Sequence, residues 1–430
     1  APSADSDTSF PSWLAMPTLR LTIRLRSNEL NGLKISDSSH SPLDTFRSTL
    51  DTFCMTSETL PYGQLTHEPR VLLGPGPSNL HPRIFQAMSS PILGYADPEF
   101  FRIMDQTMTL LRFLFQTKNE LTITLPGTGM AAMETAIANL IEPGDEVIVG
   151  IHGFFGQRMA EIVERHGGTA IRVEVEFGQV IDPMLIRKQL ESHPNVKAVG
   201  VIHADTSTGI GQPLEPIGRL CREHDKIFIV DTVCSLGGAD IPVDKLNIDI
   251  CYSAGQKCIG GPAGIAPITF SDRAVRLIEA RRRPVDTWYL DLMLLRKYWF
   301  TDRLYHHTAP GPMVYALREA LRLIYEETLT ARVARHDQYS AMLKSGLEDL
   351  GLEFFGDPEH RLSMLTCVLT GEGIDEAAVR QRLLRDYRIE IVGGFGSLAG
   401  KAWRVGLMGY SCSQRNVNYL LAALREILGR

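Results

Sequence analysis

The sequence has 430 residues, which is enough for two domains and a large hydrophobic core. A hydrophobic fraction of 44% and a charged fraction of 22% are typical of a soluble globular protein, and the net charge of -6 argues against binding to nucleic acid or to an anionic membrane surface. Because no apolar run approaches the length of a membrane span, we also expect no transmembrane segment.

The first part of the chain, residues 1–66, differs from the rest in composition. It is rich in Ser and Thr and shows no sustained hydrophobic periodicity. The segment Met16–Ser27 is basic and contains no acidic residue, as in a mitochondrial or plastid presequence; the alternative is a disordered extension. The final tripeptide, Leu428-Gly429-Arg430, is not a peroxisomal signal of the SKL type. We expect an intracellular protein, cytoplasmic or mitochondrial, in which residues 1–66 lie outside the folded domains.

Strand-like apolar runs alternate with helical segments in the next part of the chain. A loop rich in Gly and Pro begins at Arg70, and helical periodicity covers Phe101–Phe115. Apolar runs then end at Gly150, Asp205 and Asp231, and a fourth, Ile248–Tyr252, is followed closely by Lys257. Helical segments lie between these runs, at 157–166 and 217–224. This alternation predicts a mostly parallel sheet covered on both faces by helices.

The C-terminal part of the chain predicts a second, smaller unit. A long helical pattern over Pro312–Thr328 is expected to lead out of the sheet domain. Beyond it, the strand-like runs "LTCVLT" and "WRVGLMG" accompany a helix over Ala378–Tyr387 and a final helix that begins after Ser413. The sequence therefore predicts a large α/β domain over 67–329 and a small α+β domain over 330–430.

Polar residues stand where the predicted parallel strands end, and ligands bind at that edge of such sheets. Asp231 ends one strand, and Lys257 follows the next. Pyridoxal 5'-phosphate (PLP) requires such a pair, because its aldehyde reacts with a lysine amine and its ring nitrogen needs a carboxylate that keeps it protonated. The two residues therefore make this cofactor a candidate ligand.

Two further features suit the remaining groups of PLP. The glycine turn in Leu125–Ala136 leads into a helix, whose N-terminus can bind a phosphate, and Phe155 offers an aromatic face. Taken singly, each feature has an ordinary alternative: a tight turn, a core aromatic ring, a helix cap at Asp231, or a solvated Lys257. The order of turn, aromatic ring, aspartate and lysine along one chain favours the cofactor.

Six motifs in this order are similar to those of the class V aminotransferases of fold type I. They are "LLGPGPSNLHPRI", "HADTSTGIGQPL", "IVDTVCSLGG", "YSAGQKC", "LYHHTAP" and "IVGGFGSLAGKAWRVGLMGY". The chain from about Gly63 to Arg430 resembles this family, most strongly its alanine–glyoxylate and serine–pyruvate (serine–glyoxylate) branch. The resemblance implies PLP-dependent transamination between alanine or serine and glyoxylate or pyruvate, by a ping-pong mechanism. It also implies a homodimer with a shared active site.

The resemblance assigns roles residue by residue. Lys257 would form the Schiff base and act as general acid and base, and Asp231 would pair with the ring nitrogen. Further cofactor contacts would come from Thr128, Gly129, Met130 and Gln256 at the phosphate, Phe155 and Val233 on the two ring faces, and Thr206 at the phenolic oxygen. Relatives often carry Trp where this chain has Phe155 and His where it has Met130. Tyr305 and Thr308 would reach the phosphate of the neighbouring subunit.

Substrate recognition is implied in the same way. Arg404 would bind the carboxylate of the substrate, because a rigid fork of N–H groups matches that group. The loop from Gly74 to Gly76 would line the substrate pocket. Another branch of the family takes ureidoglycine as amino donor, and "SAGQKCIGGPAGIAPIT" is similar to that branch. Those members tend to have Asn where this chain has Tyr305 and Gln where it has Tyr95, so we favour alanine or serine.

Three alternatives come from other classes. A cysteine desulfurase of the same family would need an exposed cysteine on a loop near Arg404; Cys412 is the nearest in sequence, but the loop signature is missing. A non-catalytic relative would have no need of Asp231, Lys257 and Arg404 together. Metal catalysis lacks a spacing signature, because adjacent histidines such as His306 and His307 cannot readily face one ion. The seven cysteines form no CxxC pair, which indicates reduced thiols.

Overall fold

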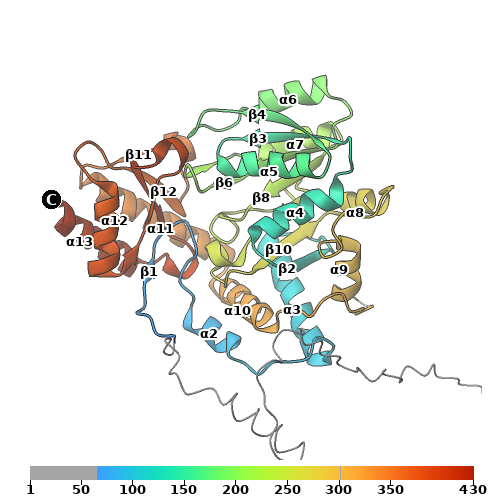
Figure 1. Cartoon of the computed structure of the whole chain (residues 1–430), viewed down its shortest axis with the longest axis horizontal. Helices are drawn as coiled ribbons and strands as arrows, with labels where there is room; N and C mark the ends of the chain where they lie inside the picture. The colour runs from blue at the N-terminus through green and yellow to red at the C-terminus, as the bar shows by residue number, and fades with distance from the viewer. Residues whose placement is uncertain (1–64, 301) are drawn as a thin grey trace, which may run out of the picture. The chain divides into compact units, whose positions relative to one another are not determined.

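The computed structural model describes residues 65–300 and 302–430 (Figure 1). Residues 68–430 form one compact unit. The presequence-like segment Met16–Ser27, and the expected leader up to residue 64, lie outside the described residues. The expectation for this segment therefore stays a prediction.

A seven-stranded sheet forms the centre of the region between residues 122 and 270. Its strands lie in the order β2 (Thr122–Pro126), β10 (Ile265–Phe270), β9 (Ile250–Tyr252), β8 (Ile227–Asp231), β5 (Ala198–Ile202), β3 (Glu146–Ile151) and β4 (Thr169–Glu174). Strand β10 is antiparallel to both of its neighbours, and every other neighbouring pair is parallel. The predicted mostly parallel sheet is confirmed.

The central strands are almost entirely apolar because both faces of the sheet are covered. All residues of β5 and β8 are buried, and successive side chains of a strand point to opposite faces. The helices of this region are α2 (Pro82–Met88), α3 (Pro98–Phe115), α4 (Gly129–Leu140), α5 (Phe154–Arg165), α6 (Pro183–Ser192), α7 (Glu215–Glu223), α8 (Asp272–Glu279), α9 (Leu292–Trp299) and α10 (Gly311–Glu327). Helices α4 and α5 contact each other and the sheet, and α6 and α7 form a second pair (Figure 1).

The predicted segments correspond closely to these elements, with one difference. The helices expected at 101–115, 157–166, 217–224 and 312–328 are α3, α5, α7 and α10. The apolar run expected to end at Asp205 is divided: β5 ends at Ile202, and β6 (Ala204–Asp205) pairs instead with β7 (Ile210–Gly211). The backbone N–H of His203, between them, still donates to the carbonyl of Asp231 in β8, so the chain leaves the large sheet only after His203.

A second sheet lies in the C-terminal region. Its order is β11 (Glu353–Phe354), β12 (Leu365–Leu369), β15 (Ala402–Gly406) and β14 (Val392–Gly393), and all pairs are antiparallel. The accompanying helices are α11 (Leu329–Glu348), α12 (Glu376–Tyr387) and α13 (Gln414–Leu428). Ser413 caps α13, as predicted, by accepting a hydrogen bond from the backbone N–H of Asn416.

This region has a hydrophobic core of its own, in which Leu343, Trp403 and Leu420 are fully buried. Leu73 belongs to the same core, next to the short strand β1 (Val71–Leu72), which pairs with β13 (Ile389–Glu390). The residues of the predicted Gly/Pro-rich loop therefore pack against the C-terminal core. The domain limits 67–329 and 330–430 stay a prediction.

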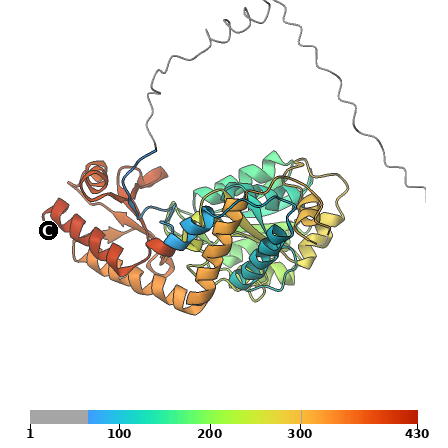
Figure 2. The same ribbon diagram turned by 90° about the horizontal axis from the view of Figure 1, so that it is seen from below.

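Helix α10 connects the two regions. It packs along α3 and α2 (Figure 2) and ends at Glu327, after which Thr328, with a φ of 70°, turns the chain into α11. Within residues 65–300 and 302–430, no helix is both long and apolar enough to cross a membrane. The same residues contain no cluster of three or more His, Cys, Asp or Glu side chains able to hold a metal ion.

Candidate active site

A cavity opens at the carboxyl edge of the large sheet, where five of its strands end. Its lining residues come from the turns that follow β2, β3, β5, β8 and β9: Thr128, Gly129, Met130, Phe155, Ile202, Ala204, Thr206, Asp231, Val233, Cys234, Gln256 and Lys257. Nine of these were predicted from the sequence. Ile202, Ala204 and Cys234 were not, although the strand-end rule that found Asp231 applies to their positions as well.

Asp231 is the last residue of β8, and its buried side chain lines the cavity. It accepts a hydrogen bond from the backbone N–H of Val233 at 2.8 Å. Burial raises the pKa of the carboxyl group from 3.8 to about 7, against the smaller lowering effect of that hydrogen bond. The nearby hydroxyl of Tyr252 lowers this pKa as well. A cationic partner would compensate the buried charge.

Lys257 lies in η1 (Gly255–Ile259), a single wide helical turn that follows β9, and its backbone angles are not helical. Its Nζ donates a hydrogen bond to the carbonyl oxygen of Pro75. Burial lowers the pKa of the amine, and the positive charge of Arg404 lowers it further. Gly76 makes this approach possible: its φ is 110°, and a Cβ atom there would lie 2.8 Å from Nζ. Burial therefore favours the neutral form of the amine.

The N-terminus of α4 provides a place for an anion. Thr128 is the N-cap residue, but its side chain makes no capping hydrogen bond. The first N–H groups of a helix have no partner within the helix and attract negative charge. Gly129 packs so closely that a Cβ atom there would lie 2.9 Å from Cγ2 of Val233. Gln256 lines the same cavity, and its side-chain NH2 group is a hydrogen-bond donor. These donors fit a phosphate.

The ring of Phe155 is placed by the buried carboxylate of Asp205. Oδ2 of Asp205 accepts from the backbone N–H of Phe155 at 3.1 Å, and Oδ1 accepts from the N–H of Ser207 at 2.8 Å. A Cβ atom at residue 153 would lie 2.3 Å from the carboxyl carbon of Asp205, so only Gly153 permits the contact. The sequence showed Asp205 at a strand end but did not reveal this supporting role.

Arg404 lies on β15 and approaches the cavity from the small sheet. Its Nε donates to the carbonyl of Gly393 at 2.9 Å, and its Nη1 donates to the carbonyl of Thr206 at 3.1 Å. The guanidinium also lies 5.8 Å from the centre of the Phe395 ring. Among the described residues it forms no ion pair, and burial lowers its pKa. A partly buried guanidinium without a counter-ion is suited to an incoming carboxylate.

Four predicted residues do not line the cavity: Arg404, which contacts the carbonyl of the lining residue Thr206, and Gly74, Tyr305 and Thr308. Pro75, next to Gly74, contacts Lys257. Tyr305 and Thr308 are joined by a hydrogen bond of 3.3 Å between their side-chain oxygens. Tyr305 is 59% exposed and packs against Tyr95, with 4.7 Å between ring centres. Neither residue reaches the cavity of its own chain, so their expected role toward a neighbouring subunit stays a prediction.

The arrangement can support a definite chemistry. A planar ring would fit between Phe155 and Val233, with a basic ring nitrogen at Asp231, an anionic group at the start of α4 and an electrophilic carbon near Lys257. The residues present therefore fit PLP.

Comparisons with known proteins agree with this geometry. Residues 92–419 match the family model described as aminotransferase class-V. The chain is 42% identical over 379 residues to (S)-ureidoglycine–glyoxylate transaminase of Bacillus subtilis, which covers 84% of this chain and 91% of that protein. It is 39% identical to alanine–glyoxylate aminotransferase of Drosophila melanogaster, over 84% and 92% of the two chains. The crystal structure of alanine–glyoxylate aminotransferase from Nostoc sp. is similar with a TM-score of 0.84 and 45% identity, covering 86% of this chain and 98% of that one.

Proposed function

This chain belongs to the class V aminotransferase family, and we propose that it transfers an amino group from alanine or serine to glyoxylate or pyruvate with PLP as cofactor. The observation that carries the proposal is the convergence of Lys257 and Asp231, from neighbouring strands, on one cavity beside the N-terminus of α4. Members of this family depend on PLP, and the reaction is expected to be ping-pong, with the oxo-acid product leaving before the second substrate enters.

We propose the cofactor contacts that the cavity supports. When bound, PLP supplies an aldehyde that links to amines and a protonated ring that withdraws electrons from the linked carbon. Asp231 would hold the proton of the ring nitrogen, while Phe155 and Val233 would enclose the ring. The hydroxyl of Thr206 would donate to its phenolic oxygen. The phosphate would be bound by residues at the start of α4 and in η1. These residues are Thr128, Gly129, Met130 and Gln256.

Lys257 is proposed to move the proton that transamination requires. Its Nζ would remove the proton from the α-carbon of the amino acid and deliver it to the carbon that was the aldehyde carbon of the cofactor. An amine can do this only in its neutral form, and burial lowers the pKa of Lys257 in that direction. The contact with the carbonyl of Pro75 would orient the amine while it is not linked to the cofactor.

Arg404 is proposed to bind the substrate carboxylate, next to the loop of Gly74. We expect Arg404→Ala to raise the KM for alanine at least tenfold, because a hydrogen bond to a charged group contributes about 1.5–3 kcal/mol. Uptake of PLP, measured from its absorption, should be nearly unchanged. Arg361→Ala is a matched control: Arg361 also binds backbone carbonyls and lies 5.5 Å from the ring of Phe354. Equal KM values for the Arg404 variant and wild type would assign the carboxylate to another residue.

A homodimer with a shared active site is also part of the proposal. Tyr305 and Thr308 lie side by side and exposed, away from their own cavity, as expected of residues that serve a neighbouring subunit. They would complete the phosphate site of the partner.

The test of the proposed function is a panel of substrates. Purified protein with PLP is incubated with glyoxylate and either alanine, serine or (S)-ureidoglycine, or with pyruvate and either serine or (S)-ureidoglycine, and the new amino acid is quantified. We expect glycine from glyoxylate, fastest with alanine or serine. If no donor yields an amino acid and no PLP absorption band forms, the chain is a non-catalytic relative and the proposal is wrong.

Ureidoglycine as donor is the second candidate. The 42% identity to the Bacillus subtilis transaminase favours it. The contact between Tyr95 and Tyr305 argues against it. The resemblance implies that members of the ureidoglycine branch have Gln at the first of these positions and Asn at the second. A rate with (S)-ureidoglycine well above the rates with alanine and serine would select this candidate.

The cysteine desulfurase alternative finds no support in the thiols. The six cysteines within the described residues are all buried and unpaired. Cys412 is 2% exposed, and burial raises its pKa to about 11, which is the opposite of a reactive thiolate. Buried, unpaired thiols also favour the proposed intracellular environment.

A further inference from the structure

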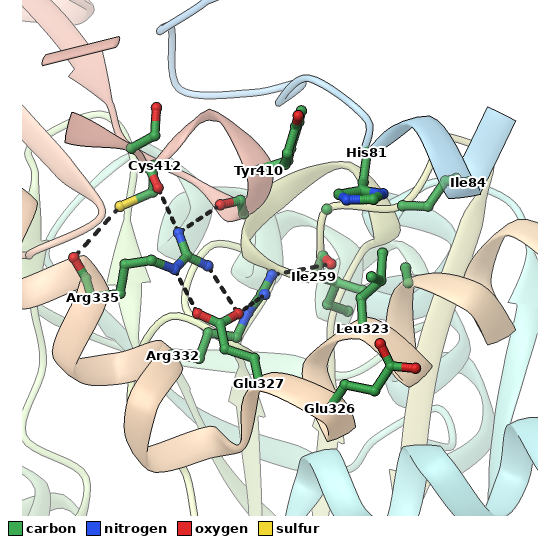
Figure 3. Close-up of a pocket in the computed structure, with 14 residues that line it drawn as sticks. His81, Ile84, Ile259, Leu323, Glu326, Glu327, Arg332, Arg335, Tyr410 and Cys412 are labelled. Atoms are coloured by element: carbon green, nitrogen blue, oxygen red, sulfur yellow. Dashed lines mark hydrogen bonds and ion pairs between the residues drawn. The ribbon is translucent and has the colours of Figure 1, made fainter. Parts of the chain in front are cut away.

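Two arginines and a glutamate form a partly buried polar cluster at the junction of α10 and α11. Figure 3 shows the guanidinium groups of Arg332 and Arg335 directed at the carboxylate of Glu327. The cluster borders a pocket near His81 and Tyr410, separate from the cavity that contains Lys257. The side chain of Arg332 is almost completely buried, with 7% of its surface exposed.

Every nitrogen of the Arg332 guanidinium has a partner, and most partners are backbone carbonyls of two loops. Nε donates to the carbonyl of Gly237 at 2.8 Å. Nη2 donates to the carbonyl of Cys258 at 2.7 Å and, more weakly, to that of Ile259 at 3.4 Å. Nη1 donates to Glu327 at 2.7 Å. One side chain thus joins the loop after Asp231 to the turn that contains Lys257.

Arg335 makes the equivalent connection to the chain beyond Arg404. Its Nη1 donates to the carbonyls of Gly409 at 3.1 Å and Cys412 at 2.6 Å, and its Nε and Nη2 bind Glu327. Gly409 in turn packs on the lysine turn, since a Cβ atom at residue 409 would lie 3.3 Å from the carbonyl oxygen of Lys257. The cluster therefore contacts all three segments that carry the proposed catalytic and substrate-binding side chains.

We propose that Arg332, oriented by Glu327, is a positioning residue that sets the distance between the Lys257 turn and the Asp231 loop. Burying a guanidinium costs free energy unless each N–H group is satisfied, and here the satisfying groups belong to the two active-site loops. A lysine at this position would keep the charge, but a single ammonium group cannot reach Gly237, Cys258 and Glu327 together. This inference rests on the proposed function of Lys257 and Asp231.

The test compares Arg332→Lys with wild type and with Arg281→Lys. Arg281 also binds two backbone carbonyls, those of Asn139 and Ile141, but at the end of α4 remote from the cavity. We expect Arg332→Lys to lower kcat about tenfold or more, since displacements of about 1 Å have such effects, with less than a twofold change in the KM for alanine. Arg281→Lys should retain the wild-type kcat. An unchanged kcat in the Arg332 variant would overturn the proposal.

A second measurement is independent of activity. In cofactor-free protein, amide hydrogen exchange should become faster in Arg332→Lys at residues 232–239 and 255–263, where Gly260 N–H donates to the carbonyl of Lys257 and Gly261 N–H to that of Gly255. Exchange in β3 should not change. Uniformly faster exchange would show a merely structural role and refute positioning. If Arg332→Lys does not fold, Glu327→Gln replaces it. We again expect faster exchange only at residues 232–239 and 255–263, and unchanged or uniformly faster exchange would refute the proposal.

The two proposals can fail separately. If wild type shows no transamination in the substrate panel, the proposed function is wrong, whatever the exchange data show. If wild type is active but the exchange of the two loops is unaffected by Arg332→Lys, only the positioning role is lost.

Discussion

Lys257→Ala is expected to abolish transamination while the protein remains folded. The methyl group can neither link to the cofactor nor carry a proton, and general acid–base catalysis alone contributes about 10²–10⁴-fold to a rate. We expect the loss in kcat to be at least of that size, with no glycine formed above background and no absorption band of lysine-bound cofactor. The fold should tolerate the change, because the amine makes one hydrogen bond, to Pro75, and its burial disfavours the charged form.

Lys344→Ala is the matched control for this prediction. Lys344 also has a pKa lowered by burial and donates to a backbone carbonyl, that of Leu362 at 3.1 Å, but it lies on α11 outside the cavity. Its variant should keep the wild-type kcat. Near-normal transamination by Lys257→Ala would contradict the role of the lysine and, with it, the proposed mechanism.

The central part of the site could be predicted because a local pattern locates it. In a parallel sheet, the residues that follow neighbouring strands meet at one edge. Asp231 and Lys257 each follow an apolar run, and the glycine turn at Gly129 and the aromatic Phe155 follow two others. Periodicity therefore predicted the fold class and the meeting of Asp231 and Lys257, whereas the glycine turn and Phe155 were added because they suit PLP.

Other parts of the site depend on contacts between distant segments, which no local pattern reveals. Arg404 lies on an ordinary antiparallel strand, and only the resemblance to a family singled it out. Leu73 lies in the C-terminal core because β1 pairs with β13, more than 300 residues along the chain. Arg332 reads as a surface residue in a polar helix, yet it binds carbonyls of Gly237 and Cys258. Such roles become visible only in three dimensions.

Asp231→Asn is the second change from which we expect a large effect. The amide keeps the size of the side chain and can still accept the N–H of Val233, so the loop should be retained. It cannot carry the negative charge that holds a proton on the ring nitrogen of bound PLP. Removing a preorganised electrostatic partner of this kind typically lowers kcat about 10²–10³-fold. Initial rates with alanine and glyoxylate at saturating PLP measure the loss.

The same variant tests the electrostatics of Asp231 without the cofactor. Burial raises the pKa of this carboxyl from 3.8 to about 7, so the folded protein binds its proton more tightly than the unfolded chain does. The stability that results is present below about pH 4 and is lost as the pH rises to about 7. The Asn side chain does not ionise, so the variant does not lose this stability as the pH rises. The cofactor-free variant should therefore gain stability relative to wild type between pH 5 and pH 8, by on the order of a few kcal/mol.

Urea unfolding of the cofactor-free proteins at pH 5 and pH 8 measures this difference. Asp375→Asn provides the control, because Asp375 is an exposed cap that accepts the N–H of Ala378, and Asn caps helices equally well. The free energy of unfolding of the control should differ from that of wild type by the same small amount at both pH values. If Asp231→Asn behaves like the control, the carboxyl is not a buried acid; if it also keeps the wild-type kcat, Asp231 is not the partner of the ring nitrogen.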